Sequence, residues 1–301
     1  MSKKAQVRFL DLEPAYCRYD FSRFTILPVP YEGTVSYGTG TAKAPAAIIK
    51  ASTQVELFDE ELRGEFFQAG VFTVEELNCQ TANSGKLQQR IEKTSSQLLE
   101  DGKFVLALGG EHSISTGLVT AAVKHWPNLS VLHLDAHTDL RDSYQLNKYS
   151  HACVMRRISE LPVPIVSVGI RSYSLEESEF LNSSGHPQGR IITAREIAKA
   201  RNDSSAGEQW MERVLAGLSE KVYVSVDIDV FDPGQAPGTG TPEPGGLDWY
   251  EVTGLLRRVS QNKQIVSADI VEVIPKVAGE VSEFLAACLA YKIIAYSQQK
   301  S

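Results

Sequence analysis

The chain has 301 residues, of which 43% are hydrophobic and 22% are charged, and its formal net charge is −7. This length suits one large α/β domain or two smaller ones, and the acidic balance without a basic run argues against a nucleic-acid-binding surface. Four scattered cysteines suit a reducing compartment, and no stretch holds the ~18 apolar residues that a membrane helix needs. The N-terminus lacks the apolar core of a secretion signal. We therefore expect a cytoplasmic protein without membrane or nucleic-acid partners.

The N-terminal half alternates apolar strands with helical segments. A predicted strand at 24–29 leads into a loop rich in Gly and Tyr, PYEGTVSYGTGTAKAP, which either lines a site or simply connects elements. The next predicted elements are a short helix at 46–51 with Pro45 in its first turn, a helix at 85–102, a strand at 104–108, a helix at 114–126, a strand at 131–135 and an irregular loop to about Ser150.

The C-terminal half continues the alternation. Its predicted elements are a strand at 164–169, a helix at 175–181, a strand at 190–193, a helix at 207–219, a strand at 222–229, a helix at 249–261, a strand at 264–273 and a helix at 281–296. Most strands are continuously apolar, which is typical of strands covered on both faces. We predict an α/β fold with three layers, α/β/α, around a mainly parallel sheet. Residues 1–301 form a single domain, with residues 1–22 as an N-terminal extension packed on or near it.

Polar side chains that can bind metal follow four of the predicted strands, at the carboxyl edge where open α/β sheets bind ligands. These residues are Glu111 and His112 after FVLALGG, Asp135, His137 and Asp139 in VLHLDAHTD, Asp227 and Asp229 in VYVSVDID, and Glu272 in SADIVEV. The spacing of two in DAHTD predicts side chains that converge on one side of a strand end. Any one of them has a plain explanation, such as a capping Asp or a buried polar His. Together, the buried carboxylates repel one another and require a compensating positive charge.

The charge count predicts two metal ions. Four aspartates match two divalent cations, and two imidazoles add neutral nitrogen ligands. A carboxylate and imidazole set without thiolates disfavours structural zinc and suits Mn²⁺, with other divalent first-row metals as alternatives. Because two such ions can deprotonate a shared water near neutral pH, the sequence predicts metal-assisted hydrolysis.

Four motifs resemble, in order and spacing, those of the ureohydrolase family, which includes arginase and agmatinase: GGEHS, LDAHTD, SVDIDVFDPGQAPGTGTPEPGG and DIVEV. The resemblance runs from about Pro30 to the C-terminal helix, and the long third motif is very specific. It implies an arginase-like fold and a homo-oligomer, either a trimer or a hexamer. It also implies a binuclear manganese site with one ion on His112, Asp135, Asp139 and Asp227, the other on Asp135, His137, Asp227 and Asp229, and both Asp135 and Asp227 bridging.

The same resemblance implies catalytic roles. His151 takes the place of a mobile, proton-shuttling histidine, and Glu272 that of a carboxylate that orients the guanidinium group. For Glu272 the structural alternative is an ion pair with an arginine such as Arg171. Thr241, in the rigid Pro/Gly loop, would contact substrate beside these two residues. In the implied mechanism a metal-bridging hydroxide attacks the guanidinium carbon, and the metals and Asp139 stabilise the tetrahedral intermediate. Urea and an amine are released.

The loop RDSYQLNKYSHACVMRR narrows the substrate. It lacks the S-G-N-L-H-G-like sequence with which arginases bind an α-carboxylate and an α-amino group, and it looks more like the agmatinase branch. Agmatine, cleaved to putrescine and urea, is therefore the expected small guanidino substrate. The alternatives are a guanidinobutyrase, an aminopropylagmatine ureohydrolase, an arginase or a non-catalytic metal-binding relative. A mononuclear zinc deacetylase of related fold would not require all six ligands.

Three positions depart from the family pattern. Glu111 stands where Asp is common, which concerns the hydrogen bonding beside His112. Pro28 stands where many relatives carry Gly, and Ala44 replaces the Gly usual before a proline. The last two concern the N-terminal wall of the site. We expect the loops around Tyr31 and His151 to choose the substrate.

Overall fold

An eight-stranded sheet organises the computed structural model, which describes residues 7–81, 83–183, 190–201 and 209–299. The strand order is β4-β1-β5-β10-β9-β6-β7-β8, and every neighbouring pair is parallel. The strands are β1 (Phe24–Val29), β4 (Val71–Thr73), β5 (Phe104–Gly109), β6 (Leu129–Leu134), β7 (Ile165–Ile170), β8 (Ile191–Thr193), β9 (Lys221–Asp227) and β10 (Gln264–Val271). A separate antiparallel pair joins β2 (Phe58–Asp59) to β3 (Gly64–Glu65).

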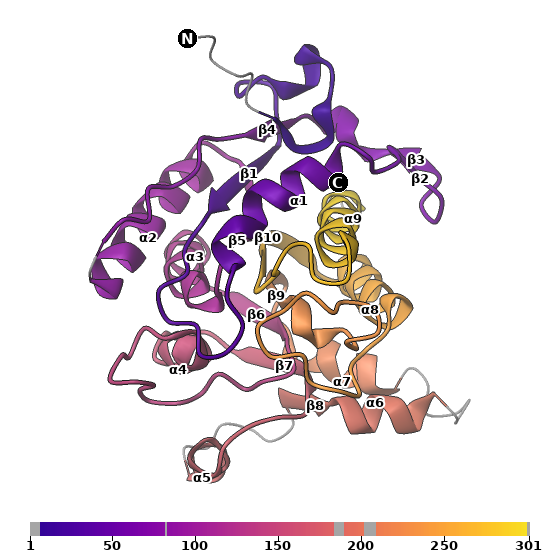
Figure 1. Ribbon diagram of the computed structural model, residues 1–301. Coiled ribbons are helices and arrows are strands. Elements are labelled where there is room, and N and C mark those ends of the chain that lie inside the picture. Colours follow the sequence, from indigo (N-terminus) through magenta and orange to yellow (C-terminus); the bar gives the residue numbers. More distant parts are fainter. Residues whose placement is uncertain (1–6, 82, 184–189, 202–208, 300–301) are drawn as a thin grey trace.

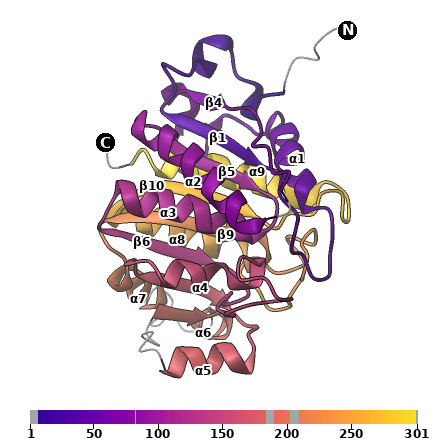
Figure 2. The ribbon, with the colours of Figure 1, turned by 90° about the vertical axis from the view of Figure 1, so that its left-hand side faces the viewer.

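Helices cover both faces of the sheet (Figures 1 and 2). One face carries α2 (Ser84–Glu100), α3 (Ser115–His125) and α4 (Val154–Ser159). The other carries α1 (Ala44–Ser52), α6 (Ala194–Ala200), α7 (Gln209–Gly217), α8 (Trp249–Asn262) and α9 (Val281–Tyr296). Helix α5 (Leu175–Ser183) lies at the β8 end of the sheet in both views. The predicted α/β class and three-layer architecture in a single domain are confirmed, and none of the described helices is long and apolar enough to cross a bilayer.

Two apolar clusters fill the spaces between the sheet and the two helical layers. In β5, Leu106 and Leu108 join one cluster while Val105 and Ala107 join the other. Since successive side chains of a strand point to opposite faces, a strand covered on both sides must be apolar throughout. All six residues of β5 are buried, which explains its continuous apolar run.

Short 3₁₀ helices complete the fold, and several of them begin at the edge where the strands end. They are η1 (Phe9–Asp11), η2 (Pro14–Cys17), η3 (Thr41–Lys43), η4 (Phe66–Ala69), η5 (His112–Ile114), η6 (His151–Cys153) and η8 (Ile228–Val230). Residues 1–6 of the predicted N-terminal extension lie outside the described residues. The part after them is anchored, because Phe9 N–H donates to Thr73 Oγ1 (3.1 Å) and Leu10 N–H donates to Ser52 Oγ (2.8 Å).

Three strands were predicted to extend further at their carboxyl ends than they do in the structure. Strand β6 ends at Leu134, β9 at Asp227 and β10 at Val271. The reason is local: η8 starts directly after β9, and Glu272 turns the chain away from β10 with a φ of 64°. The sequence patterns also missed short elements, namely β2, β3, β4, α4 and α6. The first residues of the helix predicted at 207–219 lie outside the described part of the chain.

Pro28 lies inside β1, a strand with neighbours on both sides, where proline usually disrupts a sheet because it lacks an N–H group. It is tolerated here because β4 pairs only with residues 24–26 of β1. Beyond that point, the Pro28 carbonyl accepts a hydrogen bond from Leu77 N–H (2.9 Å). The departure at Pro28 is therefore accommodated by the short partner strand.

Candidate metal centre and substrate cavity

Four strands that are adjacent in the sheet, β5, β10, β9 and β6, deliver the predicted site residues. His112 follows β5, Glu272 follows β10, Asp227 ends β9 and Asp135 follows β6. Because parallel strands end at one edge, residues far apart in the chain meet there. Strands β5 and β6 follow each other in the chain but are not neighbours in the sheet, because β10 and β9 lie between them.

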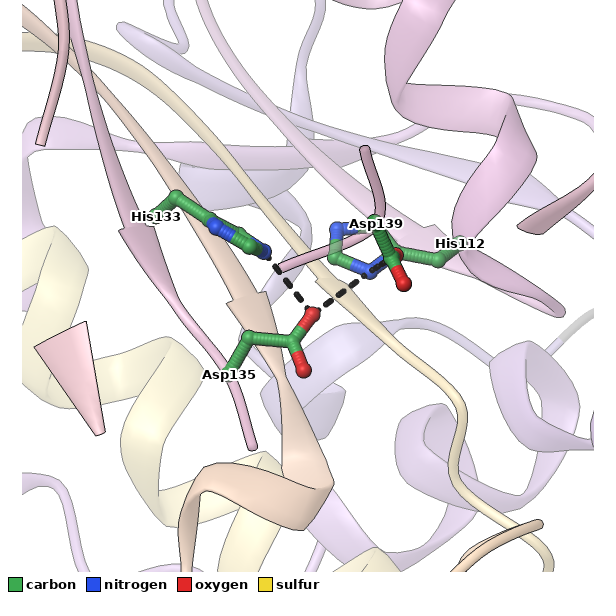
Figure 3. Close-up of side chains that lie close together, drawn as sticks. All are labelled: His112, His133, Asp135 and Asp139. Carbon is green, nitrogen blue, oxygen red and sulfur yellow. Dashed lines mark hydrogen bonds and ion pairs between the residues drawn. The ribbon is translucent and has the colours of Figure 1, made fainter. Parts of the chain in front are cut away.

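His112 lies among three carboxylates, two of which, Asp135 and Asp139, are drawn in Figure 3. Its Nδ1 atom is 3.1 Å from Asp135 Oδ2, 3.2 Å from Asp139 Oδ2 and 3.3 Å from Asp227 Oδ2. This nitrogen is buried and yet has no hydrogen-bond partner of acceptable geometry among the residues that the structure describes. A buried nitrogen without a partner, surrounded by carboxylate oxygens, fits a cation bound between these groups.

A second group adjoins the first one. His137 Nδ1 lies 3.0 Å from Asp229 Oδ2 and 3.4 Å from Asp135 Oδ1. Asp135 therefore turns one oxygen toward each histidine, which is the arrangement needed for a bridging carboxylate. Asp227 turns Oδ2 toward His112, while its Oδ1 accepts the N–H of Asp229 (2.9 Å). The structure thus brings all six predicted ligands together, and the His/Asp cluster is capable of binding metal.

The charges in this cluster also fit bound cations. Burial, followed by the nearby Asp229 and Asp135 carboxylates, raises the pKa of Asp227 well above its ordinary value. The pKa of Asp229 is raised by burial and by Asp135. Burial lowers the pKa of His112, but the three aspartate carboxylates that lie close to its ring outweigh burial and raise that pKa well above 6.5. Oxygen and nitrogen ligands without sulfur, carrying excess negative charge, match divalent first-row metals.

Two site residues have left-handed backbone conformations, with φ values of 51° at Asp139 and 64° at Glu272. Such conformations cost a non-glycine residue roughly 1–3 kcal/mol, so the surrounding structure must hold them. The sequence predicts that Asp139 reaches Asp135 by strand alternation. This prediction is wrong, because β6 ends at Leu134, before either residue. A turn carries Asp139 there, and Glu177 Oε1 fixes that turn by accepting from Thr138 Oγ1 (2.7 Å) and Leu140 N–H (3.0 Å).

His133 belongs to the cluster and was missed by the sequence reasoning. Its Nε2 atom is 2.8 Å from Asp135 Oδ2, and its Nδ1 is 3.1 Å from Ser167 Oγ (Figure 3 shows the first contact). With Nε2 protonated, His133 donates to Asp135 and accepts from the Ser167 hydroxyl. The signal was available, because His133 precedes Asp135 by two residues and so shares its face of β6.

A hydrogen-bonded pair on two neighbouring strands supports His112 from behind. Ser225 Oγ lies 3.0 Å from His112 Nε2 and donates to Asp269 Oδ1 (2.8 Å). Asp269 is fully buried and also accepts from the Tyr223 hydroxyl (2.6 Å). Groups that bind the second nitrogen of a ligand histidine fix its tautomer and ring orientation. Sequence alone could not reveal this pair, since it depends on Ser225 and Asp269 being in register across β9 and β10.

A cavity of about 320 Å³ opens above the cluster. Asp135 is fully buried and belongs to the floor of this cavity, below the side chains that line it. The other predicted site residues all line the cavity: His112, His137, Asp139, His151, Asp227, Asp229, Thr241 and Glu272. Residues 35–38 reach the cavity from the N-terminal loop. Tyr31 itself is buried and lines a neighbouring cleft, so the loop around it reaches the cavity only through these later residues, and its part in substrate choice stays a prediction.

Glu272 is held at the cavity wall by the loop after β5. Its backbone N–H donates to the Gly110 carbonyl (2.8 Å), and its Oε1 accepts from His112 N–H (2.7 Å). Burial, followed by the Glu111 carboxylate, raises the pKa of Glu272 well above its ordinary value. The alternative of an ion pair with Arg171 is wrong, because Arg171 donates to the backbone carbonyls of residues 169, 229 and 243. Glu272 is therefore available to a ligand.

Comparison with known proteins decides the family, since a sequence profile of the arginase family matches residues 22–295. The chain belongs to the arginase family. The predicted resemblance to ureohydrolases is confirmed, and the chain is a guanidino ureohydrolase, a hydrolase that acts on linear amidines.

Three similar proteins illustrate the breadth of the match. An N(1)-aminopropylagmatine ureohydrolase from Synechocystis sp. is 38% identical, covering 97% of this chain and 95% of its own. An agmatinase from Bacillus anthracis is 35% identical over 85% of each chain. The crystal structure of agmatine ureohydrolase from Thermoplasma volcanium superposes with a TM-score of 0.83, at 31% identity, covering 98% of this chain and 96% of that one.

Proposed function

We propose that this ureohydrolase cleaves guanidino amines that carry no distal carboxylate, with agmatine, yielding putrescine and urea, as the lead substrate. The observation that carries the proposal is that Glu272 lines the same cavity as the metal-ligand candidates His112 and Asp229. A guanidinium group presents two parallel N–H groups to a carboxylate, which holds its plane in one orientation. Bound in that way, its central carbon would face the metal cluster.

We further propose that the cluster holds two Mn²⁺ ions, on the ligand sets implied by the family resemblance. Bound there, the two cations would supply a water molecule deprotonated near neutral pH and positive charge at the reacting carbon. Asp139, in its left-handed turn, would orient groups at the first ion beside His112. His151 would carry a proton between solvent and the leaving amine. Thr241 would complete the wall beside Glu272.

N(1)-aminopropylagmatine is the second candidate substrate. The relative that bears this activity in its name covers 97% of the chain, whereas the agmatinase from Bacillus anthracis covers 85%. Both substrates combine a guanidinium with a cationic tail. Three tyrosines at the cavity, Tyr37, Tyr144 and Tyr173, offer ring faces that attract ammonium groups.

A urea-release assay on the Mn²⁺-loaded enzyme tests these proposals, with agmatine, N(1)-aminopropylagmatine, arginine and 4-guanidinobutyrate as substrates. We expect the highest kcat/KM for agmatine. A higher value for the aminopropyl derivative would replace the lead by the second candidate. A preference for arginine or guanidinobutyrate would contradict the proposal that the substrate carries no distal carboxylate. Failure of all four, with metal bound, would favour a non-catalytic metal-binding relative.

We also propose a cytoplasmic homo-oligomer, a trimer or a hexamer, which rests on the family resemblance. Light scattering coupled to size-exclusion chromatography tests the assembly. A mass of one subunit, 33.1 kDa, at micromolar concentration would contradict it.

A further inference from the structure

We propose that Glu111 and Thr34 form a positioning unit for His151, which holds the histidine loop at the cavity wall and sets the tautomer of its ring. This inference rests on the proposed function, because it assumes that His151 moves protons there. It concerns residues outside the metal ligands. It also gives a purpose to Glu111, the position at which the chain departs from the aspartate common in the family.

Both carboxylate oxygens of Glu111 accept hydrogen bonds from Thr34. Its Oε2 accepts from Thr34 N–H (2.7 Å), and its Oε1 accepts from the Thr34 hydroxyl (2.7 Å). Oε1 accepts a third hydrogen bond from Ser113 Oγ (2.7 Å). Glu111 is fully buried, where each lost hydrogen bond would leave a buried polar group without a partner. The carboxylate therefore fixes both the backbone and the side chain of Thr34.

Thr34 passes this constraint on to His151. Its Oγ1 accepts from the backbone N–H of His151 (3.0 Å), and Nδ1 of the imidazole lies 3.4 Å away. Since the single hydroxyl proton of Thr34 points to Glu111, the oxygen can only accept from the ring, which favours the tautomer with the proton on Nδ1. Ser150 Oγ lies 3.3 Å from the same nitrogen but can donate or accept, so Thr34 decides the tautomer. The Nε2 atom, 3.5 Å from Ser36 Oγ, is then the nitrogen available to exchange a proton in the cavity.

The unit joins three loops at one buried carboxylate. Thr34 lies in the loop after β1, Glu111 in the loop after β5 and His151 at the start of η6. The first of these loops is braced from within, because Glu32 accepts from Gly40 N–H (3.0 Å) and Ala42 N–H (2.9 Å). An aspartate at 111 would withdraw the carboxylate by about 1.5 Å, one carbon–carbon bond, and could not keep both contacts with Thr34. A proton carrier must lie within hydrogen-bond reach of the reacting group, so these contacts bear on kcat.

A double-mutant cycle tests whether Thr34 acts through His151. Thr34→Val is made in the natural chain and in a His151→Asn background, and urea release is measured with Mn²⁺ and the best substrate of the panel. Alone, Thr34→Val is expected to lower kcat about tenfold with KM changed less than about threefold, because general acid–base catalysis depends on placement. In the His151→Asn background, Thr34→Val is expected to have no further effect.

Two variants serve as controls. Thr34→Ser keeps the hydroxyl and is expected to restore kcat. Thr53→Val removes a hydroxyl at the end of α1 that bonds to the neighbouring Lys50 and Gln54, and it is expected to leave kcat unchanged. Equal losses from Thr34→Val in both backgrounds, with urea still released, would overturn the positioning role alone. Full activity of His151→Asn would overturn the proton-transfer role in the proposed function.

A second readout does not depend on turnover. The chain has six histidines, so the imidazole nitrogens are resolvable by ¹⁵N NMR with diamagnetic Mg²⁺ in place of Mn²⁺, and His151→Asn identifies the signal. We expect the neutral ring of His151 to carry its proton on Nδ1 and none on Nε2, and we expect a mixture of the two tautomers in Thr34→Val. A spectrum that Thr34→Val leaves unchanged would overturn the proposal even if no substrate of the panel were cleaved.

Discussion

The floor and the rim of the cavity are built in opposite ways. The floor residues Asp135 and His112 are 0% and 1% exposed, and each is fixed by neighbouring strands. At the rim, Tyr37 and Tyr173 are 82% and 52% exposed and project from loops. Packing and hydrogen bonds leave the floor few alternatives, whereas the rim can change without disturbing the core. From this difference we infer that the floor would carry the proposed chemistry and that the rim would choose the substrate tail.

Asp229→Asn should give the largest effect, because it removes a charged oxygen from the floor. We expect kcat to fall by more than about 100-fold, because altering a group that only orients a ligand already lowers activity 10- to 100-fold. We also expect the ion held by His137 and Asp229 to be lost. Metal analysis and urea release measure both changes. Asp20→Asn, on the exposed surface and paired with Arg18, is the matched control. Unchanged metal content would show that Asp229 is not a metal ligand.

Removing metal should destabilise the floor and make stability depend on pH. Chelation is expected to lower Tm by about 4 °C for each bound ion, the loss of a ligand present at ~100 times its Kd. Burial and neighbouring carboxylates raise the pKa of Asp227 and Asp229 in the folded state. The folded state therefore binds protons more tightly than the unfolded state, so the contribution of these groups to the free energy of unfolding is present at low pH and is lost as pH rises through their folded-state pKa values. Scanning calorimetry of the metal-free protein between about pH 5 and pH 8 should therefore show Tm falling as pH rises.

The metal-loaded protein is the control, and its Tm should vary less over the same range. A metal-free Tm that rises across this interval would contradict the crowding of carboxylates at the floor.

His133→Phe tests how deep the rigidity of the floor extends. The substitution keeps a ring of similar size and removes the bond to Asp135, so metal affinity should fall 10- to 100-fold, as is usual for groups that orient a ligand. Isothermal titration with Mn²⁺ measures it, and His125→Phe, on the exposed end of α3, is the control. Unaltered affinity would mean that Asp135 is held without His133.

Tyr37→Ala should give the smallest effect. A ring face that attracts an ammonium group contributes about 0.5–1 kcal/mol at an exposed site, so KM for the cationic substrate should rise roughly two- to fivefold with kcat unchanged. Tyr250→Ala, equally exposed but on α8, is the control. A large fall in kcat would contradict the separate roles of floor and rim, because it would show that a rim residue takes part in the chemistry.

Periodicity and strand ends account for the parts of the structure that could be predicted from the sequence. Continuous apolar runs predicted a parallel sheet with two covered faces, and the shared carboxyl edge explains why His112 and Asp227 were expected together. The turns at Asp139 and Glu272 could not be predicted, because their positive φ values are held by distant partners, Glu177 and Gly110. Thr34 is equally hidden, since it bonds to Glu111 across 77 positions in the chain. Contacts of this kind depend on tertiary structure, which local patterns do not encode.

The interleaved strand order has a consequence for how the protein matures. His112 and Glu272 are 160 positions apart, and the two strands that part β5 from β6 come late in the chain. A growing polypeptide can therefore form the first helices and strands, yet it has no complete cation-binding pocket until β9 and β10 have inserted. Such distant pairings form slowly. Because binding at the finished pocket favours the native state, metal capture would act as a late checkpoint that draws nearly complete chains to their final structure.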